Sequence, residues 1–194
     1  MKHLYLTHPQ VIQDPAVPVP QWQLSDAGRA RIAALAAVPA FGPFDLIAAS
    51  AERKAQDAAE ILHDARGWPV LTRAALGEND RSATGYLPGP DFEAAADAFF
   101  ANPDHSHRGW EKARTAQARI VGAVRQVISE NPDKRILFVG HGAVGTLLRC
   151  HIAGLAINRA HDQPGNIGGC WFRFDTTLTQ GGTQWTPIET FISD

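Results

Sequence analysis

The sequence predicts an α/β fold, a three-layer α/β/α sandwich with a mostly parallel central sheet. Short runs of apolar residues alternate along the chain with longer segments whose apolar residues recur at helical spacing. The runs at residues 4–6, 44–49 and 136–139 are almost entirely apolar, as is typical of strands buried on both faces of a parallel sheet. Strands that alternate with helices in this way favour helices on both faces of that sheet.

The N-terminal part contains two predicted strands and two predicted helices. The strand at residues 4–6 leads into a Pro-rich loop that is long enough to line a site. Ser25 is a suitable N-cap for a helix that stops before Pro39. After the strand at residues 44–49, Ser50 is the predicted cap of a second helix with an apolar face.

The rest of the chain continues the alternation and ends differently. The predicted elements are a short strand near residues 70–71, an irregular loop at 77–90, a helix ending near residue 100, an amphipathic helix at 110–128, the strand at 136–139 and a buried helix after it. From residue 170 to 192 the apolar residues alternate, and Gly181-Gly182 suits a turn. This pattern predicts a hairpin of edge strands.

Composition limits the classes of function. A chain of 194 residues suits a single domain over residues 1–194 with a full hydrophobic core. A formal net charge of −2 gives no polybasic face, so we expect neither nucleic acid nor a membrane as a partner. No apolar run approaches a membrane span, and the N-terminus does not resemble a signal peptide, so we expect a cytoplasmic protein. Cys150 and Cys170 form no CxxC motif and have no zinc spacing, so we expect two small buried residues of a reduced protein.

Two histidines stand where predicted strands end. His8 closely follows the first strand, and His141 stands between Gly140 and Gly142 after the strand at residues 136–139. Ligands of open α/β sheets bind where strands end and helices begin, and glycines let the backbone approach a ligand closely. Either histidine alone is most simply structural. Because two imidazoles at two strand ends can face each other across one crevice, the pair indicates a functional site.

Three charged residues are further candidates. Arg53 lies in the first turn of the helix after Ser50, where it could form a phosphate seat with the free N–H groups of that turn. The plain alternative is a surface arginine offset by Glu52. In the following loop, Glu78 could protonate a leaving group if partial burial raises its pKa, or it could be a solvated carboxylate. Asp80 competes for the same role, and spacing alone does not separate the two.

A possible metal site has weaker support. His105 and His107 are separated by one residue, but other obvious ligands are missing nearby. A polar loop explains this segment better, so we expect no metal.

Taken in order, these residues resemble the histidine phosphatase superfamily, the phosphoglycerate mutase-like enzymes. Members open with a strand that runs into Arg-His-Gly, and four further motifs follow. Here they match Leu24-Ser25-Asp26-Ala27-Gly28 for Leu-(Ser/Thr)-x-x-Gly, residues 50–59 for Ser-x-x-x-Arg-x-x-x-(Thr)-Ala, Glu78 for the acid-bearing loop, and residues 138–142 for a buried strand ending in His-Gly. Each motif is modest alone, but five in this order are specific.

The resemblance implies a phosphoglycerate mutase-like fold and a phosphatase that needs no metal or cofactor. His8 would be the nucleophile that accepts the phosphoryl group of a small phosphomonoester as phosphohistidine. Arg53 and His141 would donate to the equatorial oxygens, and Gly142 would line the substrate site. Glu78 would protonate the leaving alcohol and later activate water.

Two departures from the family pattern support other hypotheses. Thr7-His8-Pro9 replaces Arg-His-Gly, so Thr7 offers the phosphate one neutral hydroxyl where members have a guanidinium. Asp14 stands where many members carry Asn, and its carboxylate would repel a phosphate dianion. Both changes favour a catalytically weakened or inactive relative that acts as a ligand-binding or interaction module. A mutase is less favoured, because the chain has little insertion to shield a phosphoenzyme from water.

Overall fold

The computed structural model describes residues 2–165, 167–179 and 184–192. These residues form a six-stranded sheet in the order β3-β2-β4-β1-β5-β6. The strands are β1 (His3–Thr7), β2 (Leu46–Ser50), β3 (Val70–Arg73), β4 (Ile136–Gly140), β5 (Cys170–Phe174) and β6 (Thr186–Pro187). The first four strands pair in parallel, whereas β5 pairs antiparallel with β1 and β6 antiparallel with β5. The predicted mostly parallel sheet is confirmed.

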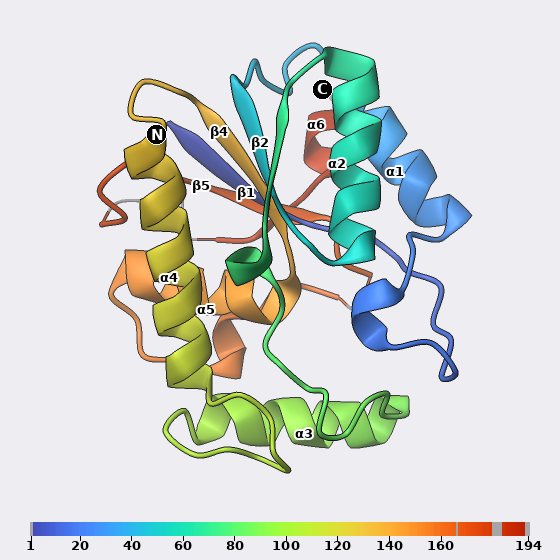
Figure 1. Ribbon diagram of the computed structural model, residues 1–194, viewed down its shortest axis with the longest axis vertical. Helices are drawn as coiled ribbons and strands as arrows, with labels where there is room; N and C mark the ends of the chain where they lie inside the picture. The colour runs from blue at the N-terminus through green and yellow to red at the C-terminus, as the bar shows by residue number, and fades with distance from the viewer. Residues whose placement is uncertain (1, 166, 180–183, 193–194) are drawn as a thin grey trace.

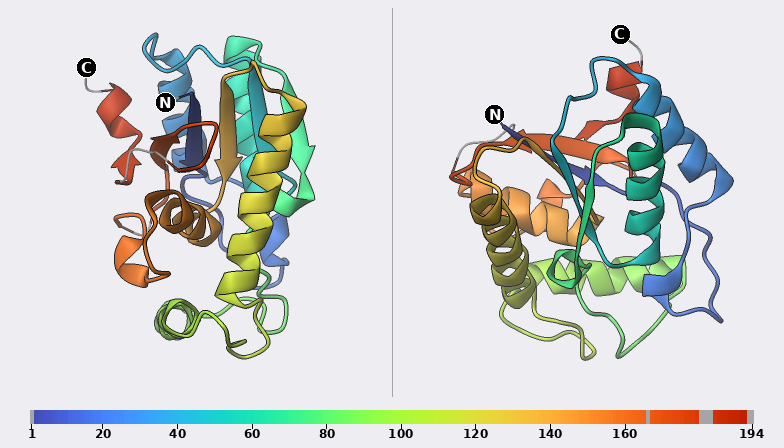
Figure 2. Two further views of the ribbon diagram at one scale, coloured as in Figure 1. Left: turned by 90° about the vertical axis from the view of Figure 1, so that its left-hand side faces the viewer. Right: turned by 45° about the horizontal axis from the view of Figure 1, so that its top comes forward.

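Helices cover both faces of this sheet, as predicted (Figures 1 and 2). One face carries α1 (Asp26–Ala37), α2 (Arg53–Arg66) and the short α6 (Glu189–Ile192). The other carries α4 (Ala113–Glu130) and α5 (Gly142–Ala153), with α3 (Gly89–Ala101) beyond the carboxyl ends of the parallel strands. One-turn 3-10 helices occupy Val19–Gln21, Ala74–Leu76 and Arg159–His161.

The strands divide the apolar side chains into two cores. Side chains alternate across a strand, so Leu4 and Leu6 join the α1/α2 core while Tyr5 joins the α4/α5 core. All five residues of β1, β2 and β4 are buried, which agrees with the continuous apolar runs in the sequence. Cys150 and Cys170 are both free and buried. No helix in the described part of the chain is both long and apolar enough to cross a membrane.

The predicted C-terminal hairpin holds only in part. Strands β5 and β6 pair antiparallel, but β6 ends at Pro187, which has no N–H to extend a ladder. The chain then forms α6 instead of continuing as a strand, and this turn packs Phe191 against Trp171 at 4.6 Å between ring centroids. The turn predicted at Gly181-Gly182 lies outside the described residues.

Two helix starts differ in how well the sequence predicts them. Ser25 caps α1 as predicted, and its Oγ accepts a hydrogen bond from Gly28 N at 3.1 Å. The prediction that Ser50 caps α2 is wrong, because Ser50 is the last residue of β2 and the helix begins at Arg53 with Glu52 as its N-cap. This shift of the helix start changes which side chain of its first turn faces the carboxyl edge of the sheet.

Candidate active site

The two strand-end histidines meet at one edge of the sheet. Strands β1 and β4 are parallel neighbours in which Thr7 is paired with Gly140, so His8 and His141 leave the sheet side by side. The backbone N–H of His8 donates to Gly140 O at 3.0 Å. The imidazole centroids are 5.2 Å apart, with 70° between the ring planes. The structure therefore brings together the two histidines that the sequence singled out.

The hydrogen bond of His8 determines which ring nitrogen carries the proton. Its Nδ1 lies 2.8 Å from the carbonyl oxygen of Pro9, and a carbonyl oxygen only accepts. The proton is therefore on Nδ1, and Nε2 of the neutral ring keeps its lone pair. Burial, followed by the positive charge of Lys54, lowers the pKa of His8 to about 4, so the ring is neutral at pH 7. A neutral imidazole with a free Nε2 can act as a nucleophile.

Both the side chain and the backbone of His141 are held by neighbouring residues. Its side chain is fully buried, and its Nε2 lies 2.8 Å from Ser50 Oγ and 3.5 Å from Glu52 Oε1. Tyr5 clamps the backbone, because its hydroxyl accepts from His141 N at 3.0 Å and donates to His141 O at 3.1 Å. Burial lowers the pKa of His141 well below its usual value, so this ring is also neutral at pH 7. Its Nδ1 is buried and has no hydrogen-bond partner among the described residues.

The first turn of α2 presents a different cation from the one predicted. The guanidinium of Arg53 turns toward Asp57, with Nε 2.7 Å from Oδ1, and its side chain is half exposed. The neighbouring Lys54 is buried, and its Nζ donates to Val19 O at 3.0 Å and to Glu52 Oε2 at 2.5 Å. One residue along a helix rotates the side chain by about 100°. The structure therefore does not bring Arg53 to the histidines and places Lys54 near them.

Sequence spacing agrees with this correction. The Ser-x-x-x-Arg pattern has its cation four residues after the serine, and four residues after Ser50 stands Lys54, whereas Arg53 is one position short. The positive charge of Lys54 acts on both histidines and lowers the pKa of each. Counting from Ser50 could have identified this residue.

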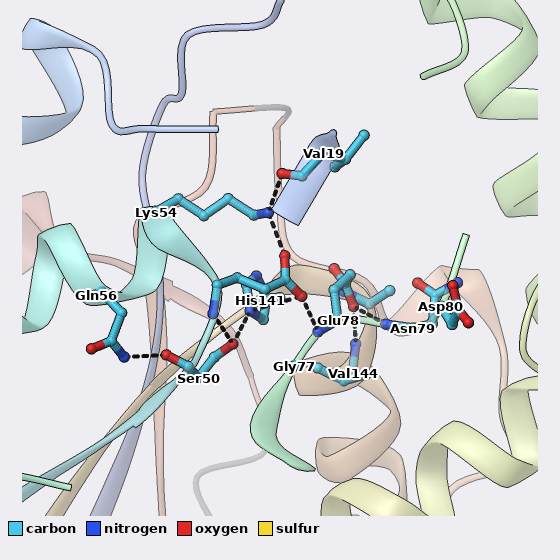
Figure 3. A network of polar contacts seen from close by, with 12 residues as sticks. Val19, Ser50, Lys54, Gln56, Gly77, Glu78, Asn79, Asp80, His141 and Val144 are labelled. Atoms are coloured by element: carbon cyan, nitrogen blue, oxygen red, sulfur yellow. Dashed lines mark hydrogen bonds and ion pairs between the residues drawn. The ribbon is translucent and has the colours of Figure 1, made fainter. Parts of the chain in front are cut away.

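Glu52 is a site residue that the sequence analysis missed. Its Oε1 accepts a hydrogen bond from Glu78 N at 2.7 Å and faces His141, while Oε2 binds Lys54. Burial alone would raise the pKa of Glu52, but His141, Lys54 and the hydrogen bonds lower it to about 2. Figure 3 shows His141 between Ser50 and Glu78, and the Lys54 side chain extends toward this cluster of polar residues. The sequence pattern contains no signal for this carboxylate beyond its position near Ser50.

Glu78 and Asp80, which the sequence left equivalent, have opposite environments. The Glu78 carboxyl accepts hydrogen bonds from Val144 N at 3.0 Å and Ala143 N at 3.2 Å, in the first turn of α5. Burial raises the pKa of Glu78 against the lowering effect of Arg81. Asp80 is exposed, and hydrogen bonds from Ser82 lower its pKa. Only Glu78 of these two combines contact with the His141 helix and a raised pKa.

The residues that depart from the expected motif behave differently from one another. Thr7 is buried, and its Oγ1 accepts from Cys170 N at 2.9 Å and donates to Gln163 Oε1 at 2.8 Å. Asp14 is exposed, and its Oδ1 accepts from Ala16 N at 2.9 Å within its own loop. The structure therefore does not bring the Asp14 carboxylate to the histidines, and the predicted repulsion has no support in these contacts.

Comparison with known proteins gives the family. Residues 17–178 match the family model of the histidine phosphatase superfamily (branch 1). The chain belongs to this superfamily. The match begins after Thr7-His8-Pro9, so the variant motif lies outside the matched residues. No curated protein matches the sequence significantly.

Solved structures agree with this membership at the level of fold. A mycobacterial glucosyl-3-phosphoglycerate phosphatase in complex with inorganic phosphate is 22% identical, with a TM-score of 0.70 over 87% of this chain and 86% of that one. The YhfR protein of Bacillus stearothermophilus is 18% identical, with a TM-score of 0.74 over 95% and 94% of the two chains. A putative alpha-ribazole-5'-P phosphatase from Escherichia coli is 18% identical, with a TM-score of 0.63 over 89% and 88%.

In this superfamily member, a cavity of about 1090 Å³ opens next to the residues that contact His141, although neither His8 nor His141 lines it. Ser50, Glu52 and Glu78 line it, and the first two of these contact His141. Other walls come from residues 15–20, which belong to the Pro-rich loop, from residues 77–82 and from residues 109–111. The Pro-rich loop, which the sequence predicts to be long enough to line a site, thus lines this cavity together with residues 77–82.

One cation of the cavity wall has no ion-pair partner among the described residues. The guanidinium of Arg81 stacks over the rings of Phe92 and Trp110, at 5.0 and 5.7 Å from their centroids. By contrast, Arg119 is paired with Glu111 at 2.7 Å. Arg81 lowers the pKa values of both site histidines, so its positive charge is felt at the site.

The loop that contains His105 and His107, the weak metal-site candidate, contributes neither histidine to the cavity lining. Asp104 is exposed and pairs with Arg114 at 2.6 Å. Within residues 2–165, 167–179 and 184–192, no group of three or more His, Cys, Asp or Glu side chains is placed to hold a metal ion.

Proposed function

We propose that this protein is a phosphohydrolase that acts on a small phosphomonoester through a phosphohistidine intermediate on His8. The observation that carries the proposal is the state of His8, whose proton is held on Nδ1 by Pro9 O while Nε2 keeps its lone pair. The low pKa of His8 keeps the ring in this nucleophilic form at neutral pH. Membership of the histidine phosphatase superfamily supports the same reaction class.

The reaction has two displacements at phosphorus. In the first, His8 Nε2 bonds to phosphorus, the bond from phosphorus to the leaving oxygen breaks, and Glu78 gives its proton to that oxygen. In the second, the Glu78 carboxylate takes a proton from water, the water oxygen bonds to phosphorus, and the phosphorus–nitrogen bond breaks. Inorganic phosphate leaves, and both side chains return to their starting protonation. The raised pKa of Glu78 supports its assignment as the acid.

His141 can supply a hydrogen bond to the phosphoryl oxygens. Ser50 Oγ accepts from Glu52 N at 3.1 Å, so its own proton is available to His141 Nε2 at 2.8 Å. With Nε2 as an acceptor, the single N–H of the neutral ring is on Nδ1, which has no partner among the described residues. An Nδ1–H donor and the nearby charge of Lys54 act on the charge that develops in the transition state.

The neighbouring structures support a phosphatase more than a mutase. Two of them are named as phosphatases, and one of these was solved with inorganic phosphate. The observation that favours the alternative, a non-enzymatic binding module, is that Thr7 replaces the motif arginine while Arg53 pairs with Asp57.

Hydrolysis of an aryl phosphate separates these possibilities. We expect wild-type activity to survive a chelator without added metal and the His8→Ala variant to lose it by at least about a thousandfold. His105→Ala, in the exposed loop, is the matched control and should retain the wild-type rate. An alkaline quench should trap phosphate on His8. Full activity of His8→Ala, or inactivation by chelator with rescue by zinc, would overturn the mechanism. An inactive wild type that binds phosphate would favour the binding module.

The assignment of the acid has its own comparison. Glu78→Gln should slow hydrolysis of alkyl phosphates, whose leaving groups need a proton, by about a hundredfold, and that of aryl phosphates much less. The exposed Asp80→Asn should change neither rate by more than about threefold. Equal effects of the two variants would contradict the role given to Glu78.

A further inference from the structure

We propose that the side-chain amide of Gln163 is a phosphate-binding donor in the place of the missing motif arginine, and that Thr7 positions it. The proposal rests on the proposed function only in assuming that phosphate binds beside His8 and His141. Thr7 precedes the first histidine, so another group must take the place of the motif guanidinium.

The hydrogen bonds of Thr7 fix the orientation of the Gln163 amide. Thr7 Oγ1 already accepts from Cys170 N at 2.9 Å, so its single proton remains to be donated. Gln163 Oε1 lies 2.8 Å away, whereas the competing Cys170 carbonyl oxygen lies at 3.3 Å. The shorter contact to Gln163 Oε1 is the better hydrogen bond. With Oε1 bound to Thr7, the amide nitrogen points away from it.

The amide nitrogen lies against the residue that follows His141. A Cβ on Gly142 would come within 2.5 Å of Gln163 Nε2, so the absence of a side chain at Gly142 leaves room for the amide. Gln163 thus touches Thr7 on one side and Gly142 on the other, the two residues adjacent to the site histidines. Among the described residues, Nε2 donates no hydrogen bond. Two N–H groups beside the histidine pair are therefore available to an anion.

The backbone of this segment is held firmly on α5. Gln163 N donates to Asp162 Oδ1 at 2.8 Å, and the same oxygen accepts from Thr146 Oγ1 of α5 at 2.8 Å. Two residues before Gln163, His161 O accepts from Arg149 Nη1 of the same helix at 3.0 Å. A donor held in this way loses little conformational freedom when it binds an anion.

A neutral amide and a guanidinium differ in what they give a phosphate. Arginine supplies charge and two parallel hydrogen bonds, whereas a glutamine amide supplies neutral hydrogen bonds only. We therefore expect Gln163 to orient the phosphoryl group and to bind it more weakly than arginine would.

Direct binding of inorganic phosphate tests this role without turnover. Gln163→Glu keeps an acceptor for Thr7 and nearly the same shape, but it replaces the N–H donors with a charged oxygen. By calorimetry we expect the phosphate Kd to rise at least about thirtyfold in this variant and about tenfold in Gln163→Ala. The exposed Gln23→Glu has the same charge change and should stay within about twofold of wild type. Thermal unfolding shows whether each variant is folded.

Folded Gln163→Glu protein that binds phosphate within twofold of wild type would overturn the proposal, as would a wild type that does not bind phosphate. These outcomes differ from failure of the proposed function, which is read from the turnover of His8→Ala. If His8→Ala keeps full activity while Gln163→Glu loses phosphate binding, the nucleophile is wrong and the role of Gln163 stands.

The positioning role of Thr7 has a separate readout. Thr7→Ser keeps the hydroxyl and should bind phosphate within about twofold of wild type, whereas Thr7→Val should bind about fivefold more weakly. If Thr7 acts through Gln163, adding Thr7→Val to Gln163→Ala should cause no further loss. Fully additive losses, or a Thr7→Ser variant as weak as Thr7→Val, would show that Thr7 does not act by holding Gln163.

Discussion

Two strand–helix junctions lie at the same edge of the sheet, and the sequence describes one of them much better than the other. At the β4–α5 junction the candidate site residue, His141, stands directly after the strand and is the N-cap of the helix. At the β2–α2 junction the inward-facing side chain, Lys54, comes from the second residue of the helix. The position of the first depends on where a strand ends, and that of the second on where a helix begins.

The difference follows from helix geometry. An error of one residue in the predicted end of a strand does little harm, because the residues that follow the strand still lie at the same edge of the sheet. In a helix, one residue turns the side chain by about 100°, so a wrong start exchanges inward and outward positions. The predicted cation, Arg53, is one residue away from Lys54, which is the buried cation at the start of this helix. Helix boundaries are the part of a sequence prediction that is least reliable.

The largest expected effect is the loss of catalytic rate when Lys54 is substituted, and it tests the inward position of this residue. We expect Lys54→Met to lower kcat/KM on an aryl phosphate by about a hundredfold, because it removes a buried positive charge near both histidines. Lys54→Arg keeps the charge and should lose less than about tenfold. Steady-state kinetics on variants shown to be folded by circular dichroism measures both.

Loss of Lys54 also leaves the Glu52 carboxylate without its partner at 2.5 Å, so destabilisation must be separated from catalysis. The double variant Lys54→Met/Glu52→Gln removes both charges and should recover most of the lost stability. A folded Lys54→Met protein with a rate within threefold of wild type would contradict the inward role of this residue.

The sequence predicts most of the fold but only part of the candidate site, and the reason is physical. Buried strands and helix faces are repeated apolar patterns, so the sheet and both covering layers could be predicted. His8, His141 and Glu78 meet because strand ends and the following loop converge on one edge. Lys54 could have been found by spacing from Ser50, but Glu52 and Gln163 depend on side-chain direction and on contacts between distant segments. Local pattern contains neither kind of information.

A smaller effect is one of pH, because burial keeps His8 and His141 neutral whereas Glu52 at the start of α2 is ionised. Burial lowers the pKa of His8 to about 4, so between pH 6.5 and 4 the unfolded chain binds a proton that the folded chain does not. The free energy of unfolding should therefore fall as pH drops through this range, by about 1.4 kcal/mol per pH unit for each such histidine. Glu52, with a pKa of about 2, stays ionised in the folded protein over this range.

Urea unfolding at pH 6.5 and 5.0 measures this contribution. Between these two values His8→Gln should lose about 1.5 kcal/mol less than wild type, because one titrating group has been removed. The exposed His105→Gln is the control and should follow the wild-type curve. Identical curves for His8→Gln and wild type would mean that His8 is not held neutral by burial.

The smallest expected effect is that of substituting Arg53, and it tests whether this side chain points away from the site. Asp57 is fully buried and also contacts Leu24 N at 2.9 Å and Arg29 at 3.0 Å, so Arg53 is one of several partners of this carboxylate. The Arg53 contact has ion-pair distance without hydrogen-bond geometry, and its side chain is half exposed. We therefore expect Arg53→Met to lower the free energy of unfolding by only about 0.5 kcal/mol in urea titrations. Its kcat/KM should stay within about threefold of wild type, because the guanidinium points toward Asp57. A hundredfold loss of kcat/KM with unchanged stability would instead place Arg53 on the phosphate and reverse the assignment of the two cations.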